Sequence, residues 1–298
     1  MTIFDRISIQ LNKLVKSNDA PRELRSLATE ALVSLGWSDE EALQFANDNE
    51  EKIQNVSKRL INAAEDRAEP VSFEFNANDP FLIQGNCYVL PDEGVSTKDD
   101  KERRANAPEL LKAIGDLNPR DFEHLCGVLL QCLAVDVPFV TQSSGDQGVD
   151  FFGKADFGKF VRGTSELGPV TENLAVWIVG QAKRYANTKV KTSDLRELVG
   201  SVELAKSRIS ADGGVALTDL EVRLCEPIFY FMVTSGVFTS GSETLLKSAG
   251  VAGFNGKRLS ILLADHGVGL DSSRVFDRKI FLQTIKDMSS VVRDPNFA

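Results

Sequence analysis

The first part of the chain alternates apolar and polar positions with the period of an α-helix. Apolar residues recur every three or four positions in three stretches, at residues 4–15, 24–35 and 53–64. This is the spacing of one helix face. Between the last two stretches, Ser38 and Glu41 form a capping box, which predicts a further short helix. We therefore expect a small helical bundle over residues 1–69.

A different pattern follows from Pro70, which ends the last helical stretch. Short runs alternate as strands do and are separated by glycine, asparagine and proline, at residues 71–75, 81–83 and 87–90. They predict a small β-rich segment over residues 70–95. Residues 96–107 are highly charged and almost free of apolar side chains. This segment is either a charged linker or a solvated helix, and we place the domain boundary there.

Residues 108–298 contain stretches with the helical period and stretches of strand length. Helical spacing is found at residues 108–114, from the Asn118-Pro119 start through Leu133, and at 194–207, 238–249 and 275–291. Apolar runs of strand length are found at residues 135–141, 149–152, 175–182, 228–234 and 259–264. Strands that alternate with helices predict an α/β fold with a central sheet flanked by helices. The polar excursion at residues 153–175 predicts an inserted hairpin or a loop over the site.

Polar residues interrupt two of these apolar runs. Asp146 precedes the predicted strand at residues 149–152, which contains Asp150, and Gln181 and Lys183 stand at the end of the next strand. Alternate residues of a strand share a face, so Gln181 and Lys183 point the same way. Carboxylate and amide oxygens suit Mg²⁺, and a lysine can hold the attacking water and offset charge on a phosphate. Glu123 adds a carboxylate in the first turn of the preceding helix.

Each of these residues also has an ordinary structural interpretation. Aspartate and glycine dominate turns, so Asp146 and Asp150 could be turn residues alone. Glu123 could simply complement the helix dipole. A single Gln-x-Lys has almost no value as a signal. The order of all three groups on successive elements carries the weight.

Charge is distributed unevenly. The formal net charge of −9 argues against a general nucleic-acid binder. Residues 1–105 hold 20 acidic and 13 basic residues, a net −7, and residues 106–298 hold 23 and 21, a net −2. Residues 173–193 contain no acidic residue and four basic residues, namely Lys183, Arg184, Lys189 and Lys191. A solvated loop would explain this run, but its place directly after Gln-x-Lys favours contact with backbone phosphates.

Composition excludes several other classes of protein. The four cysteines are scattered and only two histidines occur, which argues against a disulfide framework, a zinc site or a histidine metal site. The sequence contains no run of eighteen apolar residues, so we expect no membrane span. The first residues lack a basic region followed by an apolar core, so we expect no secretory signal and a cytoplasmic protein.

The motifs resemble the catalytic domain of the Mrr-like restriction endonucleases, in the PD-(D/E)xK nuclease superfamily. The matching pieces are Phe122-Glu123-His124-Leu125, Gly145-Asp146-Gln-Gly148-Val-Asp150, Gln181-Ala-Lys183-Arg184-Tyr185, Leu195-Arg-Glu-Leu198-x-Gly200 and Val233-Thr-Ser-Gly236-x-Phe238-Thr. The resemblance covers about residues 108–270, and the excursion at 153–175 is longer than the hairpin usual in the family. It implies a restriction-endonuclease-like mixed sheet, preceded here by the helical bundle and the β-rich segment.

The resemblance also implies roles for the residues. Asp150 would be the principal ligand of Mg²⁺, for which Mn²⁺ would substitute, and Gln181 would add an oxygen to the metal or its water. Lys183 would position the water. Glu123 would act beside the metal or hold a second ion. Asp146 would support the turn or bind a second ion. The basic side chains that would contact DNA phosphates are Arg184, Lys189 and Lys191. The implied activity is cleavage of plain or modified double-stranded DNA in restriction or antiviral defence.

Two other functions remain open at this stage. The fold could serve a catalytically silent DNA-binding or sensor module, although the complete Glu, Asp and Gln-x-Lys set argues against that interpretation. It could also belong to a repair or recombination nuclease that acts on branched DNA. The N-terminal region holds no catalytic constellation, so we expect it to serve dimerisation, contact with a defence-system partner or target recognition.

Overall fold

The structure is a computed structural model that describes residues 1–66, 70–141, 148–156, 175–186, 188–206, 222 and 226–291. Its backbone contacts divide the chain into two compact units, Met1–Asn106 and Ala107–Ala298. In the described part, no helix is both long and apolar enough to cross a membrane.

The first unit is a helical bundle, as the periodicity predicts. The bundle consists of α1 Ile3–Leu14, α2 Leu24–Ser34, α3 Asp39–Asp48 and α4 Glu50–Asp66. The predicted capping box at Ser38 is present: its side chain accepts from the amide of Glu41, which reaches back to the Ser38 amide. The apolar stripes meet in one core that includes Ile7, Leu27 and Ile53, each fully buried. The helical prediction for this region is confirmed.

The β-rich segment differs from the prediction in one strand. A three-stranded antiparallel sheet is formed by β1 Arg22–Glu23, β3 Leu82–Gly85 and β2 Phe73–Phe75, in that order. Residues 87–90 are not a strand, and β1 supplies the third strand of the sheet instead. The amide of Cys87 instead donates to the carbonyl of Ser17. The charged segment forms a solvated helix, α5 Val95–Arg104, with no buried residue.

The second unit is built on a mixed five-stranded sheet. Its strands are β4 Val135–Val140, β5 Phe151–Asp156, β6 Ala175–Lys183, β8 Ile228–Thr234 and β10 Ala252–Phe254, and their order is β10-β8-β6-β5-β4. The pairs β4–β5 and β5–β6 are antiparallel, whereas β6–β8 and β8–β10 are parallel. A separate parallel pair joins β7 Lys189–Val190 to β9 Val237–Phe238. The predicted mixed α/β sheet is confirmed.

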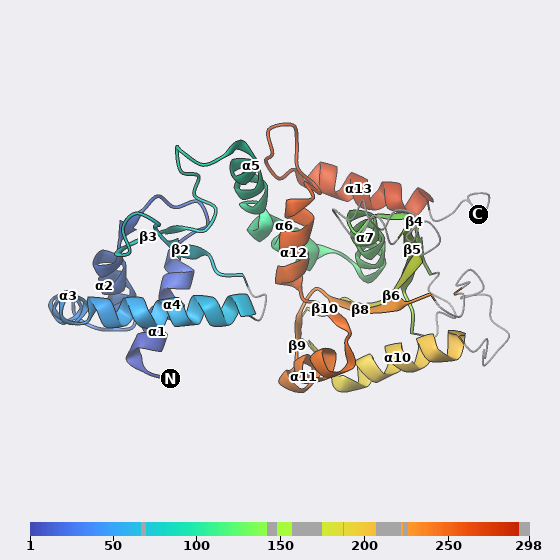
Figure 1. Ribbon diagram of the computed structural model, residues 1–298, viewed down its shortest axis with the longest axis horizontal. Helices are drawn as coiled ribbons and strands as arrows, with labels where there is room; N and C mark the ends of the chain where they lie inside the picture. The colour runs from blue at the N-terminus through green and yellow to red at the C-terminus, as the bar shows by residue number, and fades with distance from the viewer. Residues whose placement is uncertain are drawn as a thin grey trace, which may run out of the picture. The chain divides into compact units, whose positions relative to one another are not determined.

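Helices cover both faces of this sheet (Figure 1). One face packs on α6 Ala107–Asp116, α7 Pro119–Cys132, α12 Gly256–Asp265 and α13 Arg278–Val291. The other packs on α10 Thr192–Lys206 and α11 Ser240–Ala249. Strand alternation divides the side chains accordingly, since Phe151 and Ile178 belong to the first core and Phe152 and Val179 to the second. The α7 side and the α10 side are therefore two separate cores.

The prediction of a final strand at residues 259–264 is wrong. These residues lie in α12, whose N-cap Asn255 accepts from the amide of Arg258 at 2.9 Å. Leu259 and Leu263, four positions apart, are both fully buried, so the run follows the period of a helix. The last strand of the sheet is β10, which precedes that helix.

The predicted strand at residues 149–152 is shifted. β5 begins at Phe151, so Asp150 stands immediately before the strand. The strand continues to Asp156, so it includes the first residues of the predicted excursion. Residues 157–174 lie outside the described part. Gly180 lies opposite Phe151, and a Cβ at Gly180 would approach the Phe151 ring to 2.2 Å. The absence of a side chain at Gly180 lets β5 and β6 meet where the polar residues begin.

Candidate active site

The candidate residues converge where β5 begins and β6 ends. Asp150 lies before β5, and Gln181 and Lys183 are the last-but-two and last residues of β6. These ends are adjacent because the two strands are antiparallel, and Phe151 pairs with Gly180. Glu123 comes from the second turn of α7 rather than the predicted first, on the other face of the sheet from α10. Of the predicted residues, Asp146 lies outside the described part of the chain.

Asp150 is a buried carboxylate held against β6. The residue is 7% exposed, and Oδ2 accepts from the amide of Ala182 at 2.6 Å. That amide lies between Gln181 and Lys183, so the carboxylate is fixed beside both. The Asp150 amide donates to the carbonyl of Gly180 at 3.0 Å. Hydrogen bonds to an ionised acceptor are stronger than neutral ones, and the bond from Ala182 orients the carboxylate.

Gln181 is buried with an unsatisfied oxygen. It is 2% exposed, and Oε1 has no hydrogen-bond partner among the described residues. Its Nε2 lies 3.5 Å from the position that a Cβ on Gly148 would occupy, where φ is +81°. A buried acceptor without a partner is costly. An oxygen-preferring cation would satisfy this atom, so Asp150 and Gln181 have the donor chemistry that Mg²⁺ requires.

Glu123 is tied to the strand end through an arginine. Arg120 Nη1 donates to Glu123 Oε2 at 2.7 Å and to the carbonyl of Thr141 at 2.6 Å. Thr141 in turn donates through Oγ1 to the carbonyls of Val149 and Asp150. The Glu123 side chain is 20% exposed. Arg120 therefore both positions Glu123 and offsets its negative charge.

Lys183 is placed by its own backbone. Its carbonyl accepts from Thr234 Oγ1 at 2.8 Å and from the amide of Ser235 at 3.3 Å. These residues belong to the Val-Thr-Ser-Gly segment at the end of β8, which pairs with β6. The ammonium group lies 3.9 Å from Glu197 Oε2 on α10. The Lys183 side chain is 21% exposed, so its charge reaches the solvent edge of the site.

Comparison with known families agrees with this geometry. Residues 114–218 match the Mrr catalytic-domain model, which is described as a restriction endonuclease. The match shows a segment similar to the Mrr-like restriction endonucleases and leaves the rest of the chain unmatched. The matched range contains Glu123, Asp150, Gln181 and Lys183, and the resemblance expected from the sequence is confirmed for this segment. We refer to residues 114–218 as the nuclease segment.

Several solved structures are similar to the chain. MspJI restriction endonuclease, in complex with a 27-mer oligonucleotide, is 16% identical with a TM-score of 0.39, and the match covers 71% of this chain and 41% of MspJI. The DNA modification-dependent restriction endonuclease AspBHI is 17% identical with a TM-score of 0.40, and the match covers 72% of this chain and 47% of AspBHI. FokI bound to DNA is 13% identical with a TM-score of 0.33, covering 88% and 44%. The chain thus spans less than half the length of each. No curated protein matches it.

The predicted basic residues of the nuclease segment fall into two groups. Arg184 is engaged with backbone: Nε donates to the carbonyl of Leu117 at 2.7 Å, and Nη2 donates to Gly115 at the end of α6. Lys189 and Lys191 are exposed and flank the buried Val190. Lys189 lies in β7, and Lys191 follows the last residue of that strand. The structure does not bring Arg184 together with the two lysines as one patch of free side chains.

A buried cysteine lies behind the site. Cys126 on α7 is fully buried. Burial raises the pKa of its thiol well above the usual range, and the negative charges of Asp150 and Glu123 raise it further. Both carboxylates therefore lie close enough to influence the same thiol, which stays neutral and serves as a small apolar side chain.

Sequence reasoning missed the residues that support the site. Arg120 donates to Glu123, Thr141 donates to the carbonyl of Asp150, and Glu197 on α10 lies 3.9 Å from Lys183 on β6. The quoted motifs included Glu197 and Thr234 without giving them a role. Within the described ranges, no group of three or more His, Cys, Asp and Glu side chains is arranged to hold a metal. The candidate site depends on a glutamine, which lies outside that set.

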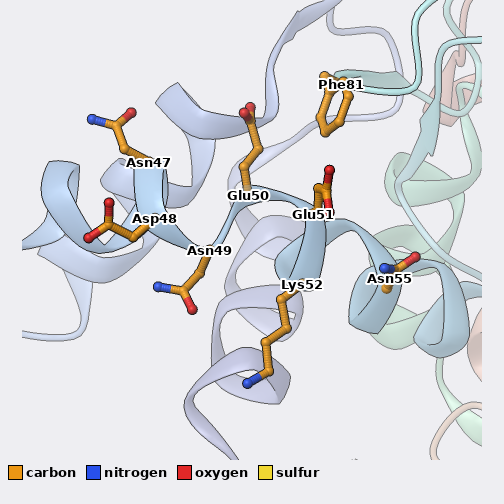
Figure 2. Close-up of a pocket in the computed structure, with 8 residues that line it drawn as sticks. All are labelled: Asn47, Asp48, Asn49, Glu50, Glu51, Lys52, Asn55 and Phe81. Carbon is orange, nitrogen blue, oxygen red and sulfur yellow. The ribbon is translucent and has the colours of Figure 1, made fainter.

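A surface pocket in the first unit has a different character (Figure 2). It lies at the junction of α3 and α4, and Phe81 is its apolar lining residue. Its remaining lining residues are polar or charged, namely Asn47, Asp48, Asn49, Glu50, Glu51, Lys52 and Asn55. Three acids against one lysine would repel a phosphate backbone. None of the predicted catalytic residues lines this pocket.

Proposed function

We propose that the chain is a Mg²⁺-dependent DNA endonuclease of the Mrr-like restriction type. It hydrolyses phosphodiester bonds of double-stranded DNA, with modified bases among its targets, in restriction or antiviral defence. Mn²⁺ substitutes for Mg²⁺. The second compact unit holds this activity, and the first unit supplies dimerisation, partner contact or target choice.

One observation carries the proposal. The buried oxygen of Gln181 lacks a partner among the described residues, beside a carboxylate that is fixed on the same strand end. Burying this acceptor without a donor costs about 1–3 kcal/mol, a cost that a bound cation would offset. The arrangement fits an oxygen-ligand site for a divalent cation.

The residues divide the chemistry between them. Asp150 and Gln181 would hold the cation through oxygen, and the bound cation supplies Lewis-acid activation of the phosphodiester. Lys183 would hold the attacking water and offset the negative charge that develops on the phosphate. Glu123, steadied by Arg120, would orient water or a second cation from the α7 side.

DNA would approach the exposed side of β7. Lys189 and Lys191 are solvent-exposed cations that follow the end of β6 by only a few residues. Contacts with phosphates position DNA without reading its sequence. Arg184 keeps its structural role at the end of α6 and contributes little to phosphate binding.

A panel of DNA substrates tests the proposal. The full chain is incubated with plain, methylated and branched double-stranded DNA, each with Mg²⁺ and with EDTA. We expect Mg²⁺-dependent cuts in linear duplex and a difference between plain and methylated DNA. Cleavage confined to branched DNA would replace restriction by repair. Tight binding without any cleavage in Mg²⁺ or Mn²⁺ would make the chain a silent sensor.

A further inference from the structure

Helix α10 directs an acidic residue at the end of β6. Its buried residues Leu195, Leu198 and Val202 pack on the sheet. Glu197 and Ser201, four positions apart, share another face. A Cβ placed on Gly148 would lie 2.9 Å from Ser201 Oγ, 3.3 Å from Glu197 Cγ and 3.5 Å from Gln181 Nε2. Helix α10 and the Gln181 side chain therefore meet at Gly148, where a Cβ would be crowded.

Two of the residues that meet at this point carry oxygens suited to a cation. Gln181 is 2% exposed, and its Oε1 has no partner among the described residues. The Glu197 side chain is 54% exposed and its Oε2 lies 3.9 Å from Lys183 Nζ. This separation is longer than a charge-assisted hydrogen bond, so the carboxylate is near the ammonium without being bound to it closely. Mg²⁺ keeps several waters, and a half-exposed carboxylate suits a partly hydrated ion.

The balance of charges in the site also favours a further acidic ligand for a divalent cation. Arg120 offsets Glu123 at 2.7 Å, and the positive charge of Lys183 equals the negative charge of Asp150. Gln181 adds an oxygen but no charge. Without Glu197, these described groups would present no net negative charge to a divalent cation. Glu197 restores one, and its charge is felt locally: after burial, Asp194 and Glu197 raise the pKa of the neighbouring Tyr185 hydroxyl.

We propose that Glu197 is the second acidic metal ligand of the site and supplies from α10 the charge that Gln181 cannot supply from β6. The carboxylate binds the cation directly or through one of its waters. This inference rests on the proposed function, because it requires that Asp150 and Gln181 hold a divalent cation.

The competing explanation gives Glu197 a surface role only. An ion pair with Lys183 that is half exposed would contribute little, and its loss would leave metal binding unchanged. The two explanations differ in direct metal binding, which a surface ion pair has no reason to alter. They can therefore be separated without relying on cleavage.

The test measures Mn²⁺ binding to the full chain by calorimetry and by the electron paramagnetic resonance of free Mn²⁺. Three neutralising variants are compared with the wild type: Glu197→Gln, the matched control Glu243→Gln on α11, and Asp150→Asn. Glu243 is exposed and lies in the same unit. We expect Glu197→Gln to raise the Kd for Mn²⁺ at least about tenfold, with an unchanged melting temperature. Cleavage should then recover in part at higher metal concentration, and Glu243→Gln should match the wild type.

Each other outcome has a definite meaning. A wild-type Kd in Glu197→Gln, with binding lost in Asp150→Asn, overturns the role of Glu197 and leaves the proposed function standing. An unchanged Kd with slower cleavage means that Glu197 acts by positioning Lys183. This result also overturns the ligand role. If the wild type binds no Mn²⁺, or Asp150→Asn binds it normally, the proposed function fails and the inference fails with it.

Discussion

Replacing Lys183 with methionine isolates the contribution of its ammonium group. The variant keeps an unbranched apolar side chain and removes the charge. The Lys183 ion pair with Glu197 is long, at 3.9 Å, and its acidic partner is 54% exposed. Loss of such a pair changes the free energy of unfolding by about 0–1 kcal/mol. The backbone anchors of Lys183 do not involve the side chain, because Thr234 and Ser235 bond to its carbonyl.

The expected loss of activity is much larger than the loss of stability. Removing one group that stabilises developing charge lowers the rate roughly a hundred- to a thousandfold, equivalent to about 2.7–4 kcal/mol. Single-turnover nicking of supercoiled plasmid in Mg²⁺ measures the rate, and thermal melting measures stability. Lys257→Met on α12 is the control, since Lys257 is exposed and lies outside the candidate site. Wild-type nicking by a folded Lys183→Met variant would refute the assignment of Lys183.

Two further predictions concern DNA binding and the division of the chain. Replacing Lys189 and Lys191 with glutamine should weaken binding equally across sequences and flatten the log–log salt dependence by roughly one unit for each phosphate that the variant no longer binds. An unchanged slope in fluorescence anisotropy titrations would return these lysines to a solvated surface. A fragment of residues 107–298 should fold and retain Mg²⁺-dependent nicking, while its oligomeric state or its selectivity changes from that of the full chain. An insoluble fragment would mean that the two units depend on each other for folding.

Local patterns predicted most of the elements that form the site. Asn118 and Pro119 mark the start of α7 because asparagine caps a helix and proline suits its first turn. The apolar run of β6 has the pattern of a buried strand, and its polar end is informative because buried strands seldom carry glutamine and lysine. The candidate site could therefore be predicted from order and residue type.

The errors arose where short apolar runs have more than one solution. Residues 259–264 are apolar enough for a strand, but the cap at Asn255 and a four-residue repeat of buried leucines make them a helix. Residues 87–90 alternate like a strand, yet β1 supplies the third strand of the sheet instead. Sheet partners are set by tertiary pairing, which a local pattern does not contain.

The supporting contacts of the site were beyond sequence reasoning for a similar reason. Arg184 looks like a phosphate ligand in the sequence, but the carbonyls that receive its donors lie at the end of α6. Glu197 looks like an ordinary exposed helix residue until α10 is placed beside Gly148 and Gln181. Such roles depend on distances between elements, and only the folded chain supplies them.

The account depends most on Asp150 as an anionic metal ligand, and Asp150→Asn tests it directly. Asparagine keeps an oxygen that can accept from the Ala182 amide, so the variant should fold. Plasmid nicking in Mg²⁺ is measured for this variant and for Asp136→Asn, an exposed aspartate on β4. We predict that Asp150→Asn lowers the nicking rate by at least roughly a hundredfold while Asp136→Asn cuts normally. Equal rates for Asp150→Asn and the wild type would contradict the account.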